Sequence, residues 1–174
     1  MTDLNRVQSS NLDAVKSDGT ATPASFAGAP STWGVTLASG TTYYFPLGAP
    51  KSPVVAESHL NSVHVRGDAA IIATFTIEDC DFYETRSPDG RGDADVSNFD
   101  ATAGYWIPEN PSSAVVSATG TGWSASAATV TSAGAGAGGA MWHLGNMGSK
   151  RMRLKVVVAG TGGKIRVAVH GKGY

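Results

Sequence analysis

Three short patterns in this 174-residue chain bring chemically active residue types close together. In the first, Gly134, Gly136 and Gly139 fit the glycine spacing of a dinucleotide-binding turn. That turn needs a strand before it, a helix after it and an acidic residue about 20 positions later. The residues AMWHL that follow alternate as a strand does, and no Asp or Glu occurs after Glu109. The glycines therefore predict a mobile loop or a close approach of another backbone, and no nucleotide cofactor.

The second pattern is an acidic run, DGRGDAD, in which Asp89, Asp93 and Asp95 lie within seven residues. Carboxylate oxygens are the ligands that Ca²⁺ prefers, but the residue order of an EF-hand loop is absent and Arg91 interrupts the run. We interpret the run as a solvated acidic loop that meets a basic protein surface. A calcium site is the alternative.

The third pattern concerns nucleophiles and metal ligands. Cys80 lies between Asp79 and Asp81, whose charges disfavour the thiolate that a nucleophile needs. No serine occupies a G-x-S-x-G turn, and the four histidines lack the spacing of a zinc site. These residues predict no catalytic site, no metal site and no enzyme.

The segments RMRLKVVV and KIRVAVH alternate apolar and basic residues on either side of the glycines at 160–163. The alternation and the glycine turn predict a C-terminal β-hairpin with one aliphatic face. Its other face would carry five basic residues: Arg151, Arg153, Lys155, Lys164 and Arg166. Like charges on one face destabilise a sheet, so this face predicts an anionic partner. The partner could be the acidic segment 78–100, a neighbouring subunit or a nucleic acid.

The charge of the chain is divided between its two parts. Residues 1–109 hold all 14 acidic groups and 6 basic ones, whereas residues 110–174 hold 7 basic groups and no acidic one. The division indicates that one face meets an opposite charge, either on a partner or on the other part of the same fold. The formal net charge is only −1, which argues against a charged disordered chain.

Short apolar alternations separated by Gly, Pro, Ser and Asp begin at Trp33, and no long window has a helical stripe. The segment AAIIATFTIE is an example, with Ile71, Phe75 and Ile77 on one face. This pattern predicts an all-β fold, an antiparallel sandwich or barrel over residues 33–174. Residues 1–32 have no periodicity and predict an extended, flexible N-terminal arm with a short helical turn near Leu12–Lys16.

Targeting signals are not visible in the sequence. The first twenty residues contain no apolar core of a signal peptide, and no stretch approaches the roughly 20 apolar residues of a membrane span. Cys80 is the single cysteine, so no intrachain disulfide can form. We expect synthesis in reducing cytoplasm and no membrane partner.

Taken together, these features resemble tailed-bacteriophage virion proteins, most closely head decoration (cement) proteins with a jelly-roll sandwich. The segment GAMWHLGNMGSKRMRLKVVVAGTGGKIRVAVHGKGY carries most of the resemblance. The resemblance implies a structural protein of the virion, assembled in the host cytoplasm. Such a protein binds the major capsid protein and neighbouring copies of itself, for example as a trimer, and its arm reaches an adjacent subunit.

Two other functions remain open from the residues. A carbohydrate- or receptor-binding module of a phage tail or fibre would use the four tryptophans and neighbouring tyrosines as stacking surfaces. A nucleic-acid-binding protein would use the five basic residues of the expected hairpin, but the chain as a whole is not basic. A protein partner is therefore the expectation, with the head, tail or baseplate location left open.

Overall fold

The secondary-structure elements of the described part of this chain are all β-strands. The computed structural model describes residues 7–16, 20–29, 32–47, 60–68, 70–80, 106–108, 115–117, 122–126, 129–144 and 152–172. Each element named in the fold, from β1 to β14, is a β-strand, which confirms the predicted all-β class. The described part of the chain contains no helix long and apolar enough to cross a bilayer.

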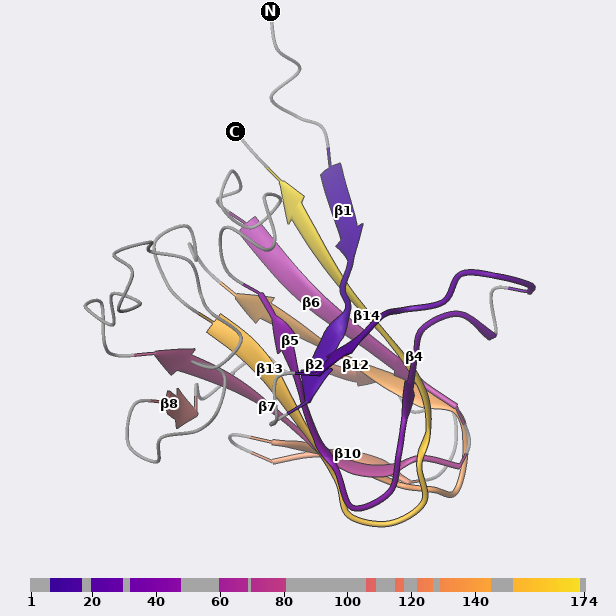
Figure 1. Cartoon of the computed structure of the whole chain (residues 1–174). Coiled ribbons are helices and arrows are strands. Elements are labelled where there is room, and N and C mark those ends of the chain that lie inside the picture. The colour runs from indigo at the N-terminus through magenta and orange to yellow at the C-terminus, as the bar shows by residue number, and fades with distance from the viewer. Residues whose placement is uncertain are drawn as a thin grey trace, which may run out of the picture.

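The strands form two antiparallel sheets, here called sheet A and sheet B (Figure 1). Sheet A contains, in spatial order, β1 (Val7–Asn11), β14 (Gly163–Lys172), β6 (Leu60–Gly67), β12 (Gly138–Leu144) and β9 (Val115–Ser117), while β4 (Val35–Leu37) pairs with the first part of β14. Sheet B contains, in spatial order, β10 (Trp123–Ala125), β11 (Val130–Ala133), β7 (Ile72–Cys80), β13 (Met152–Val158), β5 (Thr42–Pro46), β2 (Ala14–Lys16) and β3 (Ala21–Thr22), while β8 (Trp106–Pro108) pairs with the end of β7.

The order of the strands is that of a jelly roll. Its eight main strands are, in chain order, β1, β5, β6, β7, β11, β12, β13 and β14. The first of them pairs with the last, the second with the seventh, the third with the sixth and the fourth with the fifth. Two four-stranded sheets built from nested pairs of this kind define the jelly-roll sandwich. The predicted architecture is therefore confirmed.

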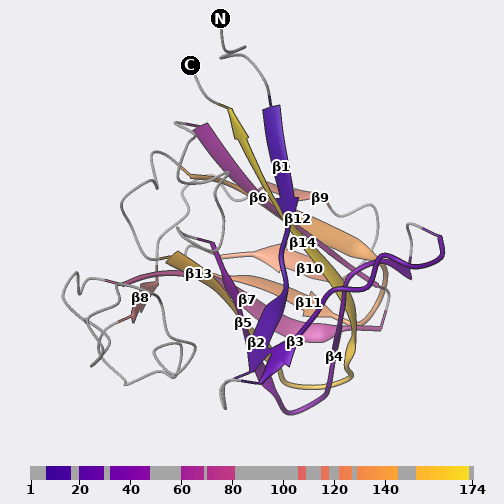
Figure 2. The ribbon, with the colours of Figure 1, turned by 45° about the horizontal axis from the view of Figure 1, so that its top comes forward.

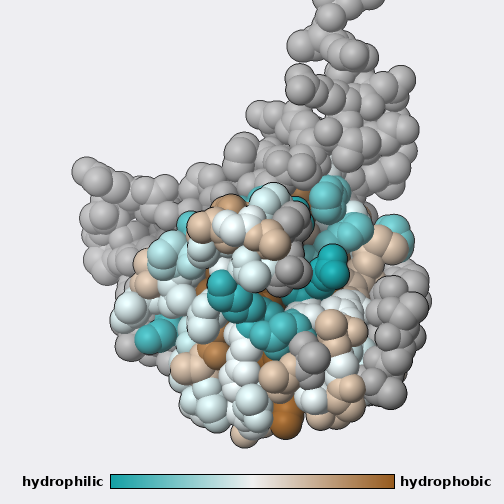
Figure 3. Space-filling model, turned by 90° about the vertical axis from the view of Figure 1, so that its right-hand side faces the viewer, coloured by the Kyte–Doolittle hydropathy of each residue, from teal (hydrophilic) through white to brown (hydrophobic). Residues whose placement is uncertain are grey.

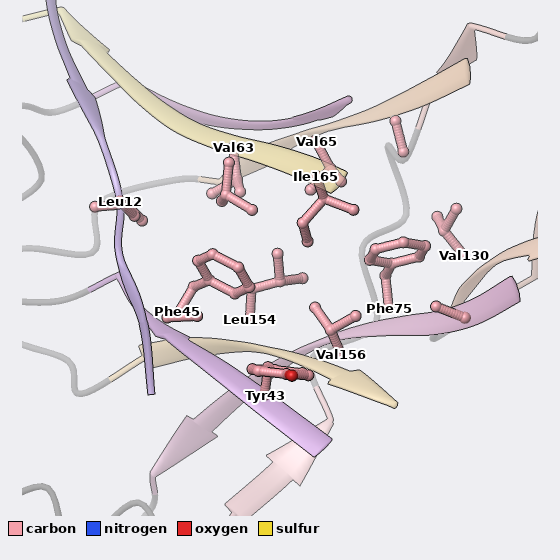
Figure 4. Packing of buried hydrophobic residues seen from close by; sticks show 14 of the residues in the cluster. Leu12, Tyr43, Phe45, Val63, Val65, Phe75, Val130, Leu154, Val156 and Ile165 are labelled. Atoms are coloured by element: carbon pink, nitrogen blue, oxygen red, sulfur yellow. The ribbon is translucent and has the colours of Figure 1, made fainter. Parts of the chain in front are cut away.

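The core lies between the sheets, where the apolar faces of the strands meet (Figure 4). Val63, Val65 and Ile165 point inward from sheet A toward Phe45, Leu154 and other buried side chains of sheet B. The alternation predicted for residues 71–77 is present, since Ile71, Ala73, Phe75 and Ile77 are buried. In the view of Figure 3, strongly hydrophobic residues appear only in small separate spots, as expected when the apolar faces are inside.

The start of the chain is extended, as predicted, but its described part is paired with the sandwich. β1 pairs with β14 in sheet A, and β2 pairs with β5 in sheet B, so this segment runs along the side of both sheets (Figure 2). The helical turn predicted near Leu12–Lys16 is wrong: Ala14–Lys16 is a strand, and Leu12 and Ala14 are buried. Pairing with two sheet edges satisfies the backbone here, so no local helix is needed.

The predicted C-terminal hairpin is also wrong. β13 belongs to sheet B and β14 to sheet A, so the two strands face each other across the core and do not pair. Met152, Leu154, Val156 and Val158 point inward, as predicted, but from the opposite sheet to Ile165. An alternating strand buries one face equally well in either position, and the glycine-rich corner at 160–163 allows the chain to change sheets.

The end of the glycine-rich segment, Gly138 and Gly139, begins β12 and brings a backbone and a tryptophan close together, which confirms one of the two interpretations of this segment. A Cβ atom on Gly139 would lie 2.4 Å from the Val65 carbonyl oxygen, and one on Gly138 would lie 2.4 Å from Trp123 Cδ1. The indole of Trp123 also stacks on Phe75, with ring centroids 5.2 Å apart. Missing side chains on sheet A therefore make room for a tryptophan of sheet B.

Candidate functional site

A loop between β3 and β4 projects from the sandwich, on the right in Figure 1. We call its described residues, 25–29 and 32–34, the aromatic loop. Ser25 and Gly34 close its base with two backbone hydrogen bonds of 2.9 and 2.8 Å. Trp33 Nε1 donates to the Gly28 carbonyl oxygen at 3.1 Å, and Thr32 Oγ1 donates to the Ala29 carbonyl oxygen at 2.8 Å. These internal bonds restrict the described residues of the loop, which lowers the entropy that they lose when a partner binds.

The aromatic loop carries an exposed phenylalanine. Phe26 is 42% exposed and meets Trp33 edge to face, with ring centroids 5.8 Å apart. The guanidinium carbon of Arg166 lies 5.6 Å from the centroid of the Trp33 ring. Aromatic residues and arginine are residue types that often contribute most of the binding energy at protein interfaces.

The loop is fixed to β14 of sheet A. Lys164 Nζ donates to the Thr32 carbonyl oxygen at 2.8 Å, which joins the basic strand to the loop. Gly34 has φ +128°, and a Cβ atom there would lie 2.1 Å from the Ile165 carbonyl oxygen. Only glycine permits this approach, so the loop and the outward residues of β14 form one continuous surface.

The outer face of sheet A continues this surface with histidines and arginines. We call it the histidine–arginine face, and its members are His64 and Arg66 on β6, His143 on β12, and Lys164, Arg166 and His170 on β14. The rings of His64 and His170 lie 4.4 Å apart between centroids, and Ser62 Oγ lies 2.9 Å from His64 Nε2. Arg66 and Arg166 stand opposite each other in the β6–β14 register.

Two histidines of this face, His64 and His170, are held toward their neutral form. Burial lowers the pKa of His64 below 6.5, and nearby His170 and His143 lower it further. Burial also lowers the pKa of His170, with a further contribution from the charge of Arg166. A folded chain with these lowered pKa values binds fewer protons near pH 6 than the unfolded chain does.

We expect acid to destabilise the protein through this cluster. The unfolded chain binds the extra protons, so the free energy of unfolding falls as the pH drops below 6.5 toward the lowered pKa values. Thermal unfolding from pH 7.5 to 5.5 at constant ionic strength measures this fall. The variant His64→Gln should match wild type at pH 7.5 and lose less stability on acidification. Parallel pH profiles for the two proteins would contradict this assignment.

The structure separates the five basic residues that the sequence placed on one surface. Lys164 and Arg166 lie on the histidine–arginine face of sheet A, whereas Arg153 and Lys155 lie on the outer face of sheet B. The prediction of a single basic face is therefore wrong, because β13 and β14 belong to different sheets. Arg151 and the acidic-loop residues Asp89, Asp93 and Asp95 lie outside the described residues.

The partner of the basic residues on sheet B is Glu78 of the neighbouring strand β7. Arg153 Nε donates to Glu78 Oε2 at 2.7 Å, and Lys155 Nζ donates to Glu78 Oε1 at 3.2 Å. The Arg153 guanidinium also lies 4.2 Å from the centroid of the Tyr44 ring, and its side chain has no exposed surface. Arg153 is therefore a structural ion-pair residue that no partner can reach in this fold.

Sequence reasoning missed Phe26 and the histidine cluster. Phe26 lies in a segment without periodicity, so nothing in the sequence indicated that internal hydrogen bonds close its loop. His64, His143 and His170 are far apart in sequence and meet only because β12, β6 and β14 are neighbours in sheet A. The one usable signal was that each histidine lies at an outward position of an alternating strand.

Two further observations concern metal binding and similarity to known proteins. No group of three or more His, Cys, Asp and Glu side chains within the described ranges is arranged to hold a metal ion. Comparison with protein-family models, with curated proteins and with solved structures found no match to this chain.

Proposed function

We propose that this protein is a structural component of a tailed-phage virion that decorates and stabilises the capsid. It would do so by binding the lattice of the major capsid protein and neighbouring copies of itself. The observation that carries the proposal is the aromatic loop, which projects from the sandwich and places Phe26 against Trp33, whose ring lies beside Arg166 of β14. An exposed, pre-organised aromatic–arginine cluster favours a protein partner.

The fold supports the same proposal by analogy. Jelly-roll sandwiches serve in viral capsids, but they also serve as lectin domains, so the fold alone does not decide between the two. The aromatic loop gives a reason to prefer a protein partner over a sugar. One face of the Trp33 ring lies toward the Arg166 guanidinium, which leaves less flat aromatic surface for a sugar ring to stack on.

Copy number and loop variants test the proposal together. In virions purified from infected cells, we expect this chain in a fixed, high ratio to the major capsid protein. The variant Phe26→Ser should lower its affinity for capsids about 30-fold, the effect of losing a hot-spot residue of about 2 kcal/mol. Val157→Ser is the matched control, because Val157 is the other large exposed hydrophobic residue of the described chain and lies on sheet B.

A different result would move the function to the alternative. The exposed Phe26 also suits a carbohydrate- or receptor-binding module of a phage tail or fibre. A few copies per particle, with glycan binding that Trp33→Ala abolishes, would establish that module and overturn the capsid proposal. Equal capsid affinity of the Phe26→Ser variant and wild type would remove the aromatic loop from the interface.

A further inference from the structure

The histidine–arginine face brings together cationic groups from three neighbouring strands. His143 on β12 and His170 on β14 both stand opposite Ser62 of the central strand β6, one on each side. His64 is two residues further along β6, diagonal to both. The next outward level holds Arg66 and Arg166 directly opposite each other. The three histidines and two arginines thus occupy three successive levels of the same face.

Neutralising groups are scarce on this face. Among the described residues of β1, β4, β6, β9, β12 and β14 there is no Asp or Glu, and Lys172 adds a further basic residue to the sequence of β14. Asp68 follows β6, and its carboxylate accepts hydrogen bonds from the backbone N–H groups of Lys164 and Ala70. Arg166 Nε donates to the neutral amide oxygen of Asn11 at 2.8 Å. Two opposed arginines on strands whose described residues include no Asp or Glu favour an anionic ligand.

We propose that the histidine–arginine face docks a carboxylate-rich polypeptide surface, and that docking strengthens as the pH falls because its histidines take up protons. The inference rests on the proposed function, since it names the chemistry of the partner and the regulation of the same surface. Near neutral pH the arginines and Lys164 provide the attraction. In acid, protonation of His64 and His170 adds up to two more charges beside them.

Reciprocity makes proton uptake and docking support each other. Protonation of His64 is opposed by burial and by repulsion from His170 and His143, and protonation of His170 is opposed by burial and by repulsion from Arg166. A bound carboxylate relieves that repulsion, so it must raise the pKa values of these histidines, and protonation must raise the affinity for the carboxylate by the same factor. The face therefore couples pH to binding without a change of fold.

A polypeptide fits this face better than a nucleic acid does. The face carries three fixed cations, Arg66, Lys164 and Arg166, whereas nucleic-acid affinity comes from many phosphate contacts. Trp33 contacts both Arg166 and the exposed Phe26. Phe26 therefore adds apolar contact area beside the basic residues, as expected at a protein interface. Arginine forms bidentate hydrogen bonds with carboxylates as it does with phosphates, so the arginines suit an acidic polypeptide and the small number of cations argues against a nucleic acid.

Binding of poly-L-aspartate to the full chain tests the inference. Aspartate remains ionised at pH 5.5, so only the protein changes charge between pH 7.5 and 5.5. We expect wild type to bind about tenfold more tightly at pH 5.5, if each new charge contributes about a factor of two to five. The double variant His64→Gln/His170→Gln should bind as wild type does at pH 7.5 and gain less than about twofold in acid. Arg66→Gln should weaken binding at both pH values.

Controls separate this inference from its alternatives. Lys16→Gln removes one positive charge on sheet B and should leave binding and its pH dependence unchanged. In NMR titrations, poly-L-aspartate should raise the histidine pKa values of wild type. Equal affinity at the two pH values, or an unchanged pH dependence in the double variant, would overturn the inference. Tighter binding of duplex DNA than of poly-L-aspartate would overturn the choice of partner, as would self-association in acid without added polymer.

Failure of this inference and failure of the proposed function are distinguishable. Capsid binding at pH 7.5 that depends on Phe26, without any acid effect on poly-L-aspartate binding, would leave the proposed function intact and remove the pH-dependent docking. Acid-enhanced binding of poly-L-aspartate in a chain that is absent from virions would do the reverse.

Discussion

Replacing Glu78 with glutamine should lower the free energy of unfolding by about 3–5 kcal/mol, the typical cost of breaking a buried ion pair. The variant removes the negative charge that neutralises Arg153, whose Nη2 lies 2.6 Å from Glu78 Oε2. Arg153 has no exposed side-chain surface, so its charge cannot return to water without local unfolding. For a chain of this length the loss corresponds to a fall in melting temperature of about 10 °C. Thermal and urea unfolding measure it.

Two further variants show whether the burial of Arg153 is the cause. Lys155 bonds to the same carboxylate but is 31% exposed, so Lys155→Gln should cost about 1 kcal/mol or less. In the double variant Glu78→Leu/Arg153→Met no buried charge remains, and most of the stability should return. If Glu78→Gln melts at the wild-type temperature, or if Lys155→Gln is equally damaging, the ion pair is not buried as described.

Replacing Gly138 with valine should also lower the free energy of unfolding strongly, by about 3–5 kcal/mol. The valine side chain would force the Trp123 indole out of the space that it occupies against Gly138. A Cβ atom at Gly138 would lie 2.4 Å from Trp123 Cδ1, and one at Gly67, its partner in the β6–β12 register, would lie 2.7 Å from Trp123 Cζ2. The indole lies against these two glycines and stacks on Phe75 at an interplanar angle of 18°. Trp123 is 6% exposed, so displacing it opens the core.

A double-mutant cycle isolates this steric cause. Trp123→Ala alone should cost a similar amount, about 3–5 kcal/mol. In that background Gly138→Val should add less than about 1 kcal/mol, because the clashing ring is gone and the two changes are not additive. Gly40→Ala is the control for glycine replacement in general. Its Cβ would meet nothing within 4 Å, so only the strain of φ +70° remains, about 1–2 kcal/mol. Additive losses at Gly138 and Trp123 would contradict this packing.

The local β-structure could be predicted from sequence because alternation is a local property. The apolar residues of β7 and β13 alternate toward the core as predicted. The prediction failed where short segments were assigned by composition. Leu12 and Ala14 are core residues in a stretch without visible periodicity, and only the pairing of β1 and β2 with two sheets places them there.

The candidate site was less accessible to prediction because it is assembled across strands. Lys164 and Arg166 were correctly placed on an outward face, but their neighbours are His64 and His170, not Arg153 and Lys155. The acidic segment 78–100 was one of the predicted partners of the basic residues. Its first residue, Glu78, does bind both Arg153 and Lys155. The fold uses that pair internally, so it does not mark a binding surface.

The alternation of apolar and polar residues is enough to predict that this chain forms strands with one apolar face around a common core, since a period of two residues depends only on neighbouring side chains. The neighbours of each strand cannot be predicted in this way: the first main strand pairs with the last, and β13 and β14 lie on opposite sides of the core. Every amphipathic strand can bury its apolar face in either sheet. The choice depends on how all the strands pack at once, and the contacts of Arg153, Trp123 and the three histidines follow from it.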